Sequence, residues 1–312
     1  MVNALQKIIQ GLAGPRMDPV LLLLRNMIEA LNSPLPRKLV IIPHNGGFFS
    51  NFNKVMNHLV CSLHHYGIRG IEVDWQIDRK RKLNEFSYGR PEDGNIWEYF
   101  FEPLSFPHYS FIRRVKRCAF NDASISHHNA HKLYQLGGEW RQRYHAAFKK
   151  HIRIRPSIQQ KVDRLYSETM ADRYCIGVHI RNEAHRIEGP NHEMPPIENY
   201  VAETKQILQS KKDEAVLFLA TDVEEYSERF KDIFHGKVVV QPGVKRLLEH
   251  PSGDLNQQLH HCHANASLKL GEDILIDCLL LSRCDVFIHT VSNVATAVGY
   301  INPTITMIYC ES

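Results

Sequence analysis

Short apolar runs alternate along the chain with segments whose apolar residues recur every three or four positions. Residues 38–43 form a short apolar run that is typical of a strand. After an Asn-Gly-Gly turn, apolar residues between positions 52 and 63 recur with helical spacing, which predicts a helix capped by Ser50 or Asn51. A second strand is expected at residues 71–75, so the first unit is a strand, a helix and a parallel strand.

A longer alternating series begins at Tyr174. Strands are expected at residues 175–180, 215–220, 237–240, 285–289 and 304–309, and helices at 196–209, 224–234, 272–283 and 293–300. Strands that alternate with helices indicate a parallel sheet with both faces covered. The chain is therefore expected to be an α/β protein with two domains in series, residues 1–170 and 171–312, which meet at a cleft.

The segments outside these two series carry weaker patterns. Residues 1–32 are typical of two short helices, residues 76–110 are irregular and aromatic, and helices are expected through residues 142–167. Basic residues concentrate between positions 113 and 155. Such a cluster is most often a solvated helix face, and an electropositive cleft for an anion is the less common alternative.

Composition indicates a soluble globular protein, with 43% hydrophobic and 23% charged residues. The longest apolar run, residues 20–24, is too short to span a membrane, and the N-terminal residues lack the pattern of a secretory leader. The seven cysteines have no regular spacing, which favours a reducing, cytoplasmic location. Basic and aromatic residues are not interleaved as in nucleic-acid-binding modules, so no nucleic-acid partner is expected.

Polar residues follow several of the predicted strands. Ligands of open parallel sheets bind beyond the carboxyl ends of the strands. The segments to consider are residues 45–51, 74–75, 179–188, 221–222 and 290–293. Four of these five are rich in polar groups suited to a sugar or a phosphate, so we expect a ligand site at these strand ends.

Each of these polar residues has more than one interpretation. Arg181 leaves a buried strand and either binds a phosphate with its planar guanidinium or pairs with a surface acid. Asp222 either caps the next helix, the interpretation we favour slightly, or accepts hydrogen bonds from a ribose or a base. Residues 290–293 open a helix with hydroxyl and amide groups, as anion sites do. Asp277 is a lone acid in an apolar helical run and needs a partner.

Four adjacent residues, His-His-Cys-His at positions 260–263, raise the alternative of a metal site. Adjacent residues of a regular element cannot all face one ion, and zinc ligands are usually spaced along the chain. We therefore expect no metal site.

Three features together resemble the superfamily of α1,6-fucosyltransferases and protein O-fucosyltransferases, and within it the bacterial nodulation-type enzymes. They are His179-Ile180-Arg181 after a strand, the Thr221-Asp222 step, and the pattern D-x-x-x-L-S-x-x-D-x-x-x-x-T-x-S that starts at Asp277. The resemblance covers residues 38–75 and 174–312. It implies the GT-B architecture, in which two Rossmann-like domains face each other across a cleft. It also implies an inverting, metal-independent transferase that moves fucose from GDP-fucose to a hydroxyl of a glycan or glycoconjugate, with no cofactor.

The resemblance assigns roles to individual residues on the donor side. Arg181 is expected to hold the β-phosphate and assist the departure of GDP, and Asp222 to lie near the nucleoside. His179 and Asp277 are expected to face the guanine end. The diphosphate is expected at the start of the helix that follows Thr290, with Ser292 and Asn293. The other wall of the cleft is expected to be the glycine turn, with Asn45, Gly46, Gly47 and Asn51.

The acceptor side is less defined, because the second arginine of the α1,6-enzymes is replaced by Asn182, and the aspartate and lysine that follow it are replaced by Ala184 and His185. Glu188 is our first candidate for the base that takes the acceptor proton, and Glu183 and His185 are the others. A transferase that uses another GDP-sugar and a non-catalytic nucleotide-sugar-binding protein are the alternatives. The aromatic residues Trp75, Trp97, Tyr99 and Phe100 either stack on a glycan or belong to the core.

Overall fold

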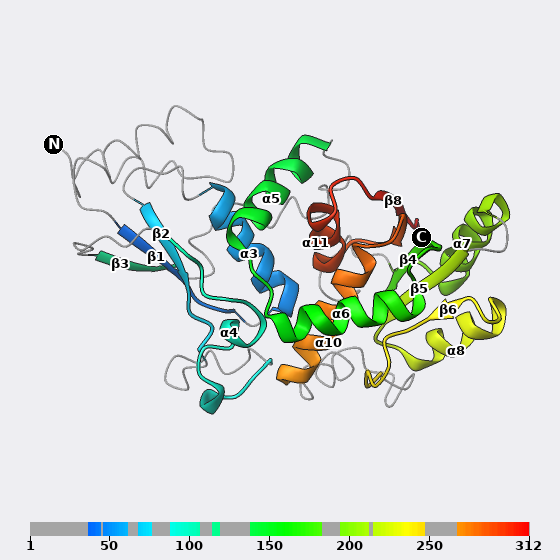
Figure 1. Cartoon of the computed structure of the whole chain (residues 1–312), viewed down its shortest axis with the longest axis horizontal. Coiled ribbons are helices and arrows are strands. Elements are labelled where there is room, and N and C mark those ends of the chain that lie inside the picture. The colour runs from blue at the N-terminus through cyan, green and yellow to red at the C-terminus, as the bar shows by residue number, and fades with distance from the viewer. Residues whose placement is uncertain are drawn as a thin grey trace.

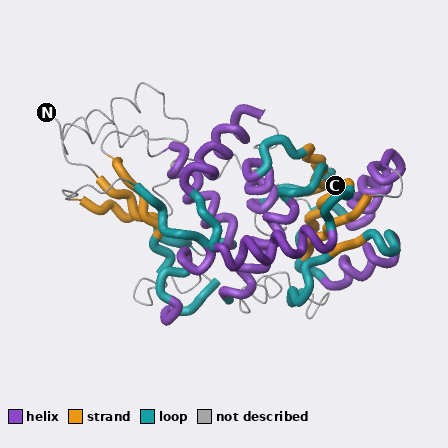
Figure 2. The backbone as a smooth tube through the Cα atoms, in the orientation of Figure 1, coloured by secondary structure: helices purple, strands orange, loops and turns teal. Residues whose placement is uncertain are grey.

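The structure is a computed structural model that describes residues 37–44, 46–61, 68–76, 88–106, 114–118, 138–182, 194–211, 215–246 and 267–311. The helices expected within residues 1–32 and the segment 260–263 lie outside these ranges. Two parallel sheets lie at opposite ends of the long axis, and most of the helices lie between them (Figure 1). The strands accordingly form two separate groups in Figure 2.

The N-terminal sheet has the strand order β2-β1-β3, and all its pairs are parallel. Its strands are β1 (Arg37–Ile41), β2 (Ile68–Val73) and β3 (Arg114–Cys118). The helix α3 (Phe48–Cys61) connects β1 to β2, as the apolar spacing predicts. The predicted cap of this helix is wrong, because the first helical bond runs from the Asn51 N–H to the Gly47 carbonyl at 3.2 Å. Ser50 and Asn51 therefore lie inside the first turn.

The strand β3 is a correction to the expected solvated helix in the basic segment. Its backbone pairs in parallel with β1 from Arg37↔Arg114 to Ile41↔Cys118. The sequence of β3 is RVKRC, whose charges conceal the strand pattern. Charged residues are common on strands at the edge of a sheet, which is where the described sheet places β3.

The C-terminal sheet has the strand order β6-β5-β4-β7-β8 and is also parallel throughout. Its strands are β4 (Tyr174–Ile180), β5 (Ala215–Thr221), β6 (Val238–Val239), β7 (Val286–His289) and β8 (Thr306–Tyr309). Each lies where the sequence predicts a strand. Every residue of β5 is buried, which explains its uninterrupted apolar run.

The helices of the C-terminal series also lie at the predicted places. They are α7 (Ile197–Lys211), α8 (Glu224–Ile233), α10 (Leu268–Leu281) and α11 (Asn293–Ile301). Two further helices, α5 (Gly138–His151) and α6 (Pro156–Thr169), lead into β4. The short helices η3 (Pro91–Asp93) and α4 (Trp97–Phe100) lie in the aromatic segment. None of the helices in the described ranges is long and apolar enough to cross a membrane.

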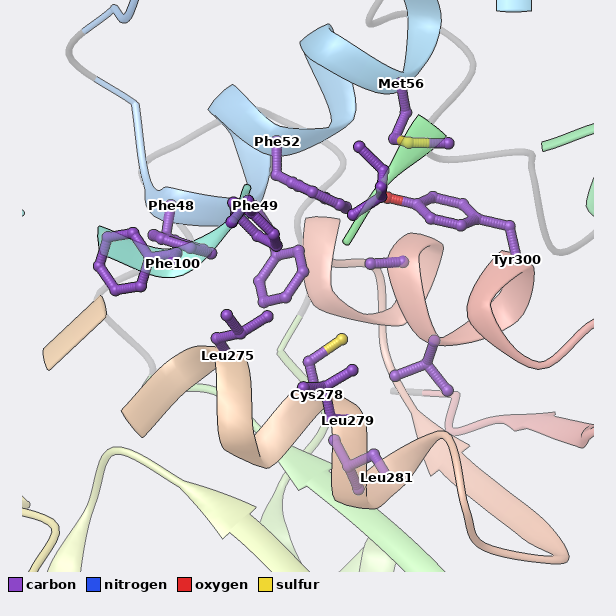
Figure 3. Packing of buried hydrophobic residues seen from close by; sticks show 14 of the residues in the cluster. Phe48, Phe49, Phe52, Met56, Phe100, Leu275, Cys278, Leu279, Leu281 and Tyr300 are labelled. Atoms are coloured by element: carbon purple, nitrogen blue, oxygen red, sulfur yellow. The ribbon is translucent and has the colours of Figure 1, made fainter. Parts of the chain in front are cut away.

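One hydrophobic cluster joins the two halves of the molecule. The helix α3 packs against α5 and α11, and α10 packs against α6 and α11. Figure 3 shows Phe52 and Met56 of α3 facing Tyr300 of α11, with Leu275 of α10 below them. The boundary between residues 170 and 171 stays a prediction, since α5 and α6 precede it and pack on helices that follow it.

The aromatic residues of the N-terminal half belong mainly to this core. The side chains of Trp75, Trp97 and Phe100 are at most 1% exposed, so they are not a platform for a glycan. Tyr99 is 42% exposed and its hydroxyl donates to Glu272 Oε2 at 3.2 Å. Of the two interpretations of these aromatics, the core one holds for the three buried residues.

Candidate functional site

The switch point of the C-terminal sheet lies between β4 and β7. From β4 the chain continues outward through β5 and β6, and it then returns to place β7 on the other side of β4. Ligands of such sheets bind at the carboxyl ends of the strands where the order reverses. Arg181 directly follows β4, and residues 290–293 directly follow β7. The structure brings them together, because the Arg181 guanidinium donates to the Val291 carbonyl at 3.4 Å.

The helix α11 begins at this switch point. Ser292 is its N-cap, and the Ser292 hydroxyl accepts a hydrogen bond from the Ala295 N–H at 2.9 Å. The same hydroxyl lies 3.4 Å from Nδ1 of His179, one residue before the end of β4. The N-terminus of a helix carries partial positive charge, so Arg181 and this helix end together form a site suited to an anion.

Asn293 is the first residue of α11 and is half-buried. Its side-chain oxygen accepts a hydrogen bond from Nδ2 of Asn53 at 3.1 Å. No residue in the described ranges accepts a hydrogen bond from its own Nδ2. Asn293 therefore adds an amide donor to the start of the helix.

Thr290 and its neighbour His289 lie deeper in the fold. The Thr290 side chain is completely buried, and His289 is 1% exposed. Burial lowers the pKa of His289 to about 4, so the imidazole is neutral near neutral pH. Both residues line a pocket between α5, α11 and β8, together with Trp140, Arg141, Ser292 and Met307. The sequence pattern gave no indication of Trp140, Arg141 or His289 at this pocket.

Asp277 lies on α10 near a group of polar residues. Burial raises the pKa of Asp277 to about 8, although the positive charge of Arg246 opposes that shift. Its Oδ1 atom is covered and has no hydrogen-bond partner among the described residues. Gln241, just beyond β6, donates to Asp273 Oδ1 at 2.9 Å, and Arg246 donates to the Gln241 carbonyl at 3.3 Å. Sequence analysis did not identify Asp273, Gln241 or Arg246, which lack a recognisable pattern.

Asp222 follows β5 at the same edge of the sheet. The interpretation of Asp222 as the cap of the next helix is wrong, because the N-cap of α8 is Val223, one residue later. Instead, the Val223 N–H donates to the hydroxyl of Thr221 at 3.2 Å. The role of Asp222 beside a nucleoside stays a prediction.

The glycine turn of the N-terminal half is held by its own side chains. Asn51 is 1% exposed, and its Oδ1 accepts from the His44 N–H at 2.8 Å. Its Nδ2 lies within 2.9 to 3.2 Å of the carbonyls of His44, Gly46 and Gly47. The Gly46 N–H donates to Nδ1 of His44 at 2.9 Å, and a Cβ on Gly46 would lie 2.5 Å from that ring. Asn51 and Gly46 therefore set the shape of the turn.

Four predicted site residues lie outside the described ranges: Asn45, Glu183, His185 and Glu188. The identity of the base accordingly stays a prediction. Within the ranges given above, no three His, Cys, Asp or Glu residues lie close enough to hold a metal ion.

Several fucosyltransferases have solved structures with a similar fold. A structure of NodZ α-1,6-fucosyltransferase co-crystallised with GDP is 17% identical and superposes with a TM-score of 0.53, covering 88% of this chain and 94% of that one. Fucosyltransferase NodZ from Bradyrhizobium gives 17% identity and a TM-score of 0.50 over 84% and 92%. POFUT1 in complex with GDP-fucose gives 10% identity and a TM-score of 0.50 over 88% and 97%. These similarities confirm the predicted GT-B fold.

Comparisons of sequence agree with the fold. No match was found among curated proteins. The model of the family described as nodulation protein Z (NodZ) matches residues 139–298, which run from α5 through most of α11 and include Arg181, Asp277 and Asn293. The match spans just over half of the 312 residues and confirms the resemblance to the fucosyltransferase superfamily. The chain belongs to the nodulation protein Z family.

Proposed function

We propose that the protein is an inverting fucosyltransferase that moves fucose from GDP-fucose to a hydroxyl of a glycan or glycoconjugate. The observation that carries this proposal is the meeting of Arg181 with the start of α11 at the switch point. Membership in the NodZ family supports the activity. Similar structures of NodZ and POFUT1 that contain GDP or GDP-fucose support the donor.

The chemistry is a single displacement at the anomeric carbon of fucose. A base takes the proton of the acceptor hydroxyl, the acceptor oxygen bonds to the anomeric carbon, and the bond to the diphosphate breaks. Negative charge then grows on the diphosphate, and Arg181 with the N-terminus of α11 stabilises it. These groups supply positive charge without a metal ion, and no other cofactor is required. Glu188 is the first candidate for the base, followed by Glu183 and His185.

Asp277 is the proposed partner of the guanine base. Guanine presents N–H donors that a carboxylate accepts, and Oδ1 of Asp277 has no acceptor role elsewhere in the described structure. The carboxyl group has a raised pKa of about 8, so it must lose its proton before both oxygens can accept. We place His179 at the same end and Asp222 beside the nucleoside.

We also propose that the reaction takes place in the cytoplasm. Cys175, Cys278, Cys284 and Cys310 are buried and free, as expected for a protein kept in a reducing compartment. Burial raises the pKa of Cys175 to about 11, so this thiol is protonated and unreactive at neutral pH.

The proposal is tested by GDP binding and GDP-fucose turnover, measured side by side in EDTA. Arg181→Ala is expected to lower turnover by about 10²–10³-fold, because the diphosphate loses its charged donor. Arg181→Lys keeps the charge but not the planar fork, so its loss should be intermediate. Arg229→Ala is the matched control, since Arg229 pairs with Glu198 on the surface of α7 and α8.

The outcomes separate the alternatives. Slow release of fucose by the wild type in EDTA, abolished by Arg181→Ala, supports the proposed function. Binding of GDP with GDP-fucose left intact would indicate another GDP-sugar or a non-catalytic nucleotide-sugar-binding protein. Failure of the wild type to bind GDP would refute the proposal.

A further inference from the structure

Asn53 links the N-terminal half of the molecule to the start of α11. It lies on α3 and is 7% exposed. Its Nδ2 donates to the backbone carbonyl of Asn293 at 3.0 Å and to Oδ1 of Asn293 at 3.1 Å. Its Oδ1 accepts from the Tyr300 hydroxyl at 2.7 Å. Tyr300 is fully buried and reaches from α11 toward α3 (Figure 3).

These contacts determine the orientation of both carboxamides. A backbone carbonyl only accepts, so the Asn53 group that faces the Asn293 carbonyl must be the NH2 group. The Asn293 group that faces the same NH2 must then be its oxygen. The Tyr300 hydroxyl in turn donates to the oxygen of Asn53. The oxygen and nitrogen of each side chain are thus assigned by the hydrogen-bond network.

The orientation of Asn293 decides what the start of α11 presents to a ligand. With its oxygen bonded to Asn53, the side chain of Asn293 presents its NH2 group, which has no acceptor among the described residues. A rotated carboxamide would instead present an oxygen, which repels an anion. We infer that Asn53 is a positioning residue that holds Asn293 as a hydrogen-bond donor to the diphosphate.

This inference rests on the proposed function, because Asn293 meets a diphosphate only if the protein binds a GDP-sugar. A merely structural role for Asn53 would be to hold α3 against α11. Other contacts already do this, because Phe52 and Met56 of α3 belong to the same hydrophobic cluster as Ala295, Val298 and Tyr300 of α11. The two roles predict different effects of substitution.

The test compares Asn53→Asp with Asn53→Ala by the Kd for GDP. A carboxylate at position 53 only accepts, so it draws the NH2 of Asn293 toward itself and turns the oxygen of Asn293 to the ligand. We expect Asn53→Asp to weaken GDP binding by about tenfold to a hundredfold. Asn53→Ala releases Asn293 without reversing it, and we expect a loss of about threefold to tenfold.

A double-mutant cycle with Asn293→Ala gives the decisive measurement. In the Asn293→Ala variant, Asn53→Asp should reduce the affinity for GDP only by the amount that the added negative charge causes by itself. Asn57→Asp measures that charge effect, because Asn57 lies one turn further along α3 and, among the described residues, its side chain only accepts a hydrogen bond, from the Tyr144 hydroxyl at 2.8 Å. Tyr300→Phe removes the donor to Asn53 with little loss of volume. Tyr300→Phe should weaken GDP binding slightly when Asn293 is present, and it should have no effect on GDP binding in the Asn293→Ala variant.

Thermal unfolding without GDP shows that each variant is folded. If Asn53→Asp does not fold, Tyr300→Phe and Asn53→Ala complete the cycle. Multiplicative effects of Asn53 and Asn293 substitutions on the Kd would overturn the inference, as would a larger loss for Asn53→Ala than for Asn53→Asp. If Asn293→Ala binds GDP like the wild type, the inference fails while the proposed function stands. If the wild type does not bind GDP, both fail.

Discussion

The turns β1–α3 and β7–α11 share a design but differ in where their side chains bond. In each, a parallel strand ends, a short turn follows and an asparagine lies in the first turn of the next helix. Asn51 is 1% exposed, and both ends of its carboxamide bond to the turn itself. Asn293 is half-buried, and only its oxygen has a partner in the described structure. The same residue type therefore stabilises one turn and is available to a ligand in the other.

This difference shows why polar residues after strands do not by themselves identify a binding site. The sequence predicts Asn51 and Asn293 alike as ligand-binding residues. The contacts distinguish them, because a buried carboxamide with all its groups bonded has none left for a ligand. A residue that bonds with one group and presents the other is both oriented and available.

The largest effect is expected for Asn51→Ala, on stability. The substitution leaves the buried His44 N–H without its Asn51 acceptor and removes the bonds to the turn carbonyls. We expect a loss of about 2–4 kcal/mol in the free energy of unfolding, measured with urea. Asn199→Ala is the control, since Asn199 on α7 makes an exposed bond to the Glu311 carbonyl. An Asn51→Ala protein as stable as this control would contradict the structural role.

Asn293→Ala is expected to give the opposite result. Its unfolding free energy should change by less than about 1 kcal/mol, because only the bond from Asn53 to its side chain is lost. Its affinity for GDP should fall by about tenfold to a hundredfold, since a donor to a charged group is removed. Calorimetric titration with GDP and urea unfolding measure the two quantities. If Asn293→Ala loses stability but keeps its affinity for GDP, Asn293 has the same structural role as Asn51, and the proposed difference between the two turns is contradicted.

Asp277 extends the comparison to α10 through the pH dependence of binding. With a pKa of about 8, the carboxyl group is mostly protonated at neutral pH. GDP affinity should rise about fivefold from about pH 7 to about pH 8 as the carboxylate forms, and Asp277→Asn should remove this rise. Isothermal titration of both proteins across this window measures it. A wild type whose Kd does not change over this range would contradict the contact with guanine.

The same group has a predictable effect on stability. The pKa of Asp277 is higher in the folded protein than the ordinary value of 3.8. The contribution of this group to the free energy of unfolding is therefore fully present below about pH 4, where the carboxyl group is protonated in both states. It is lost as the pH rises through about 8. Without GDP, the wild type should lose stability over this range relative to Asp277→Asn. Urea unfolding at several pH values measures the difference.

The alternation of apolar runs predicted most of the fold correctly. Buried strands such as β5 carry a strong pattern, because both faces of the strand require apolar side chains. The strand β3 was missed because the interactions that define it come from β1, far away in the sequence. Its local composition, rich in arginine and lysine, indicates solvent exposure as readily as an edge strand.

The candidate site was predictable as a set of strand ends but not in its contacts. Arg181, His179 and Ser292 do come together, because the carboxyl ends of neighbouring parallel strands meet. Asn53 could not be identified, since its function depends on a contact 240 positions along the chain. Asp285 is the second aspartate of the motif that starts at Asp277, and it has a structural role. Its carboxylate accepts a hydrogen bond from the Cys175 N–H at 2.7 Å, where β4 and β7 begin.

The smallest expected effect concerns a third turn, between β5 and α8. Thr221 stabilises this turn by accepting from the Val223 N–H, so Thr221→Val should lower the unfolding free energy by about 0.5–1 kcal/mol. Thr204→Val is the matched control, because the Thr204 hydroxyl donates to the Tyr200 carbonyl at 2.7 Å within α7, where the backbone already bonds. Urea unfolding measures both. A larger loss for Asp222→Ala than for Thr221→Val would show that Asp222 holds the turn, as Asn51 does. If Asp222→Ala instead weakens GDP binding without changing stability, Asp222 is a ligand-binding residue, as proposed for Asn293.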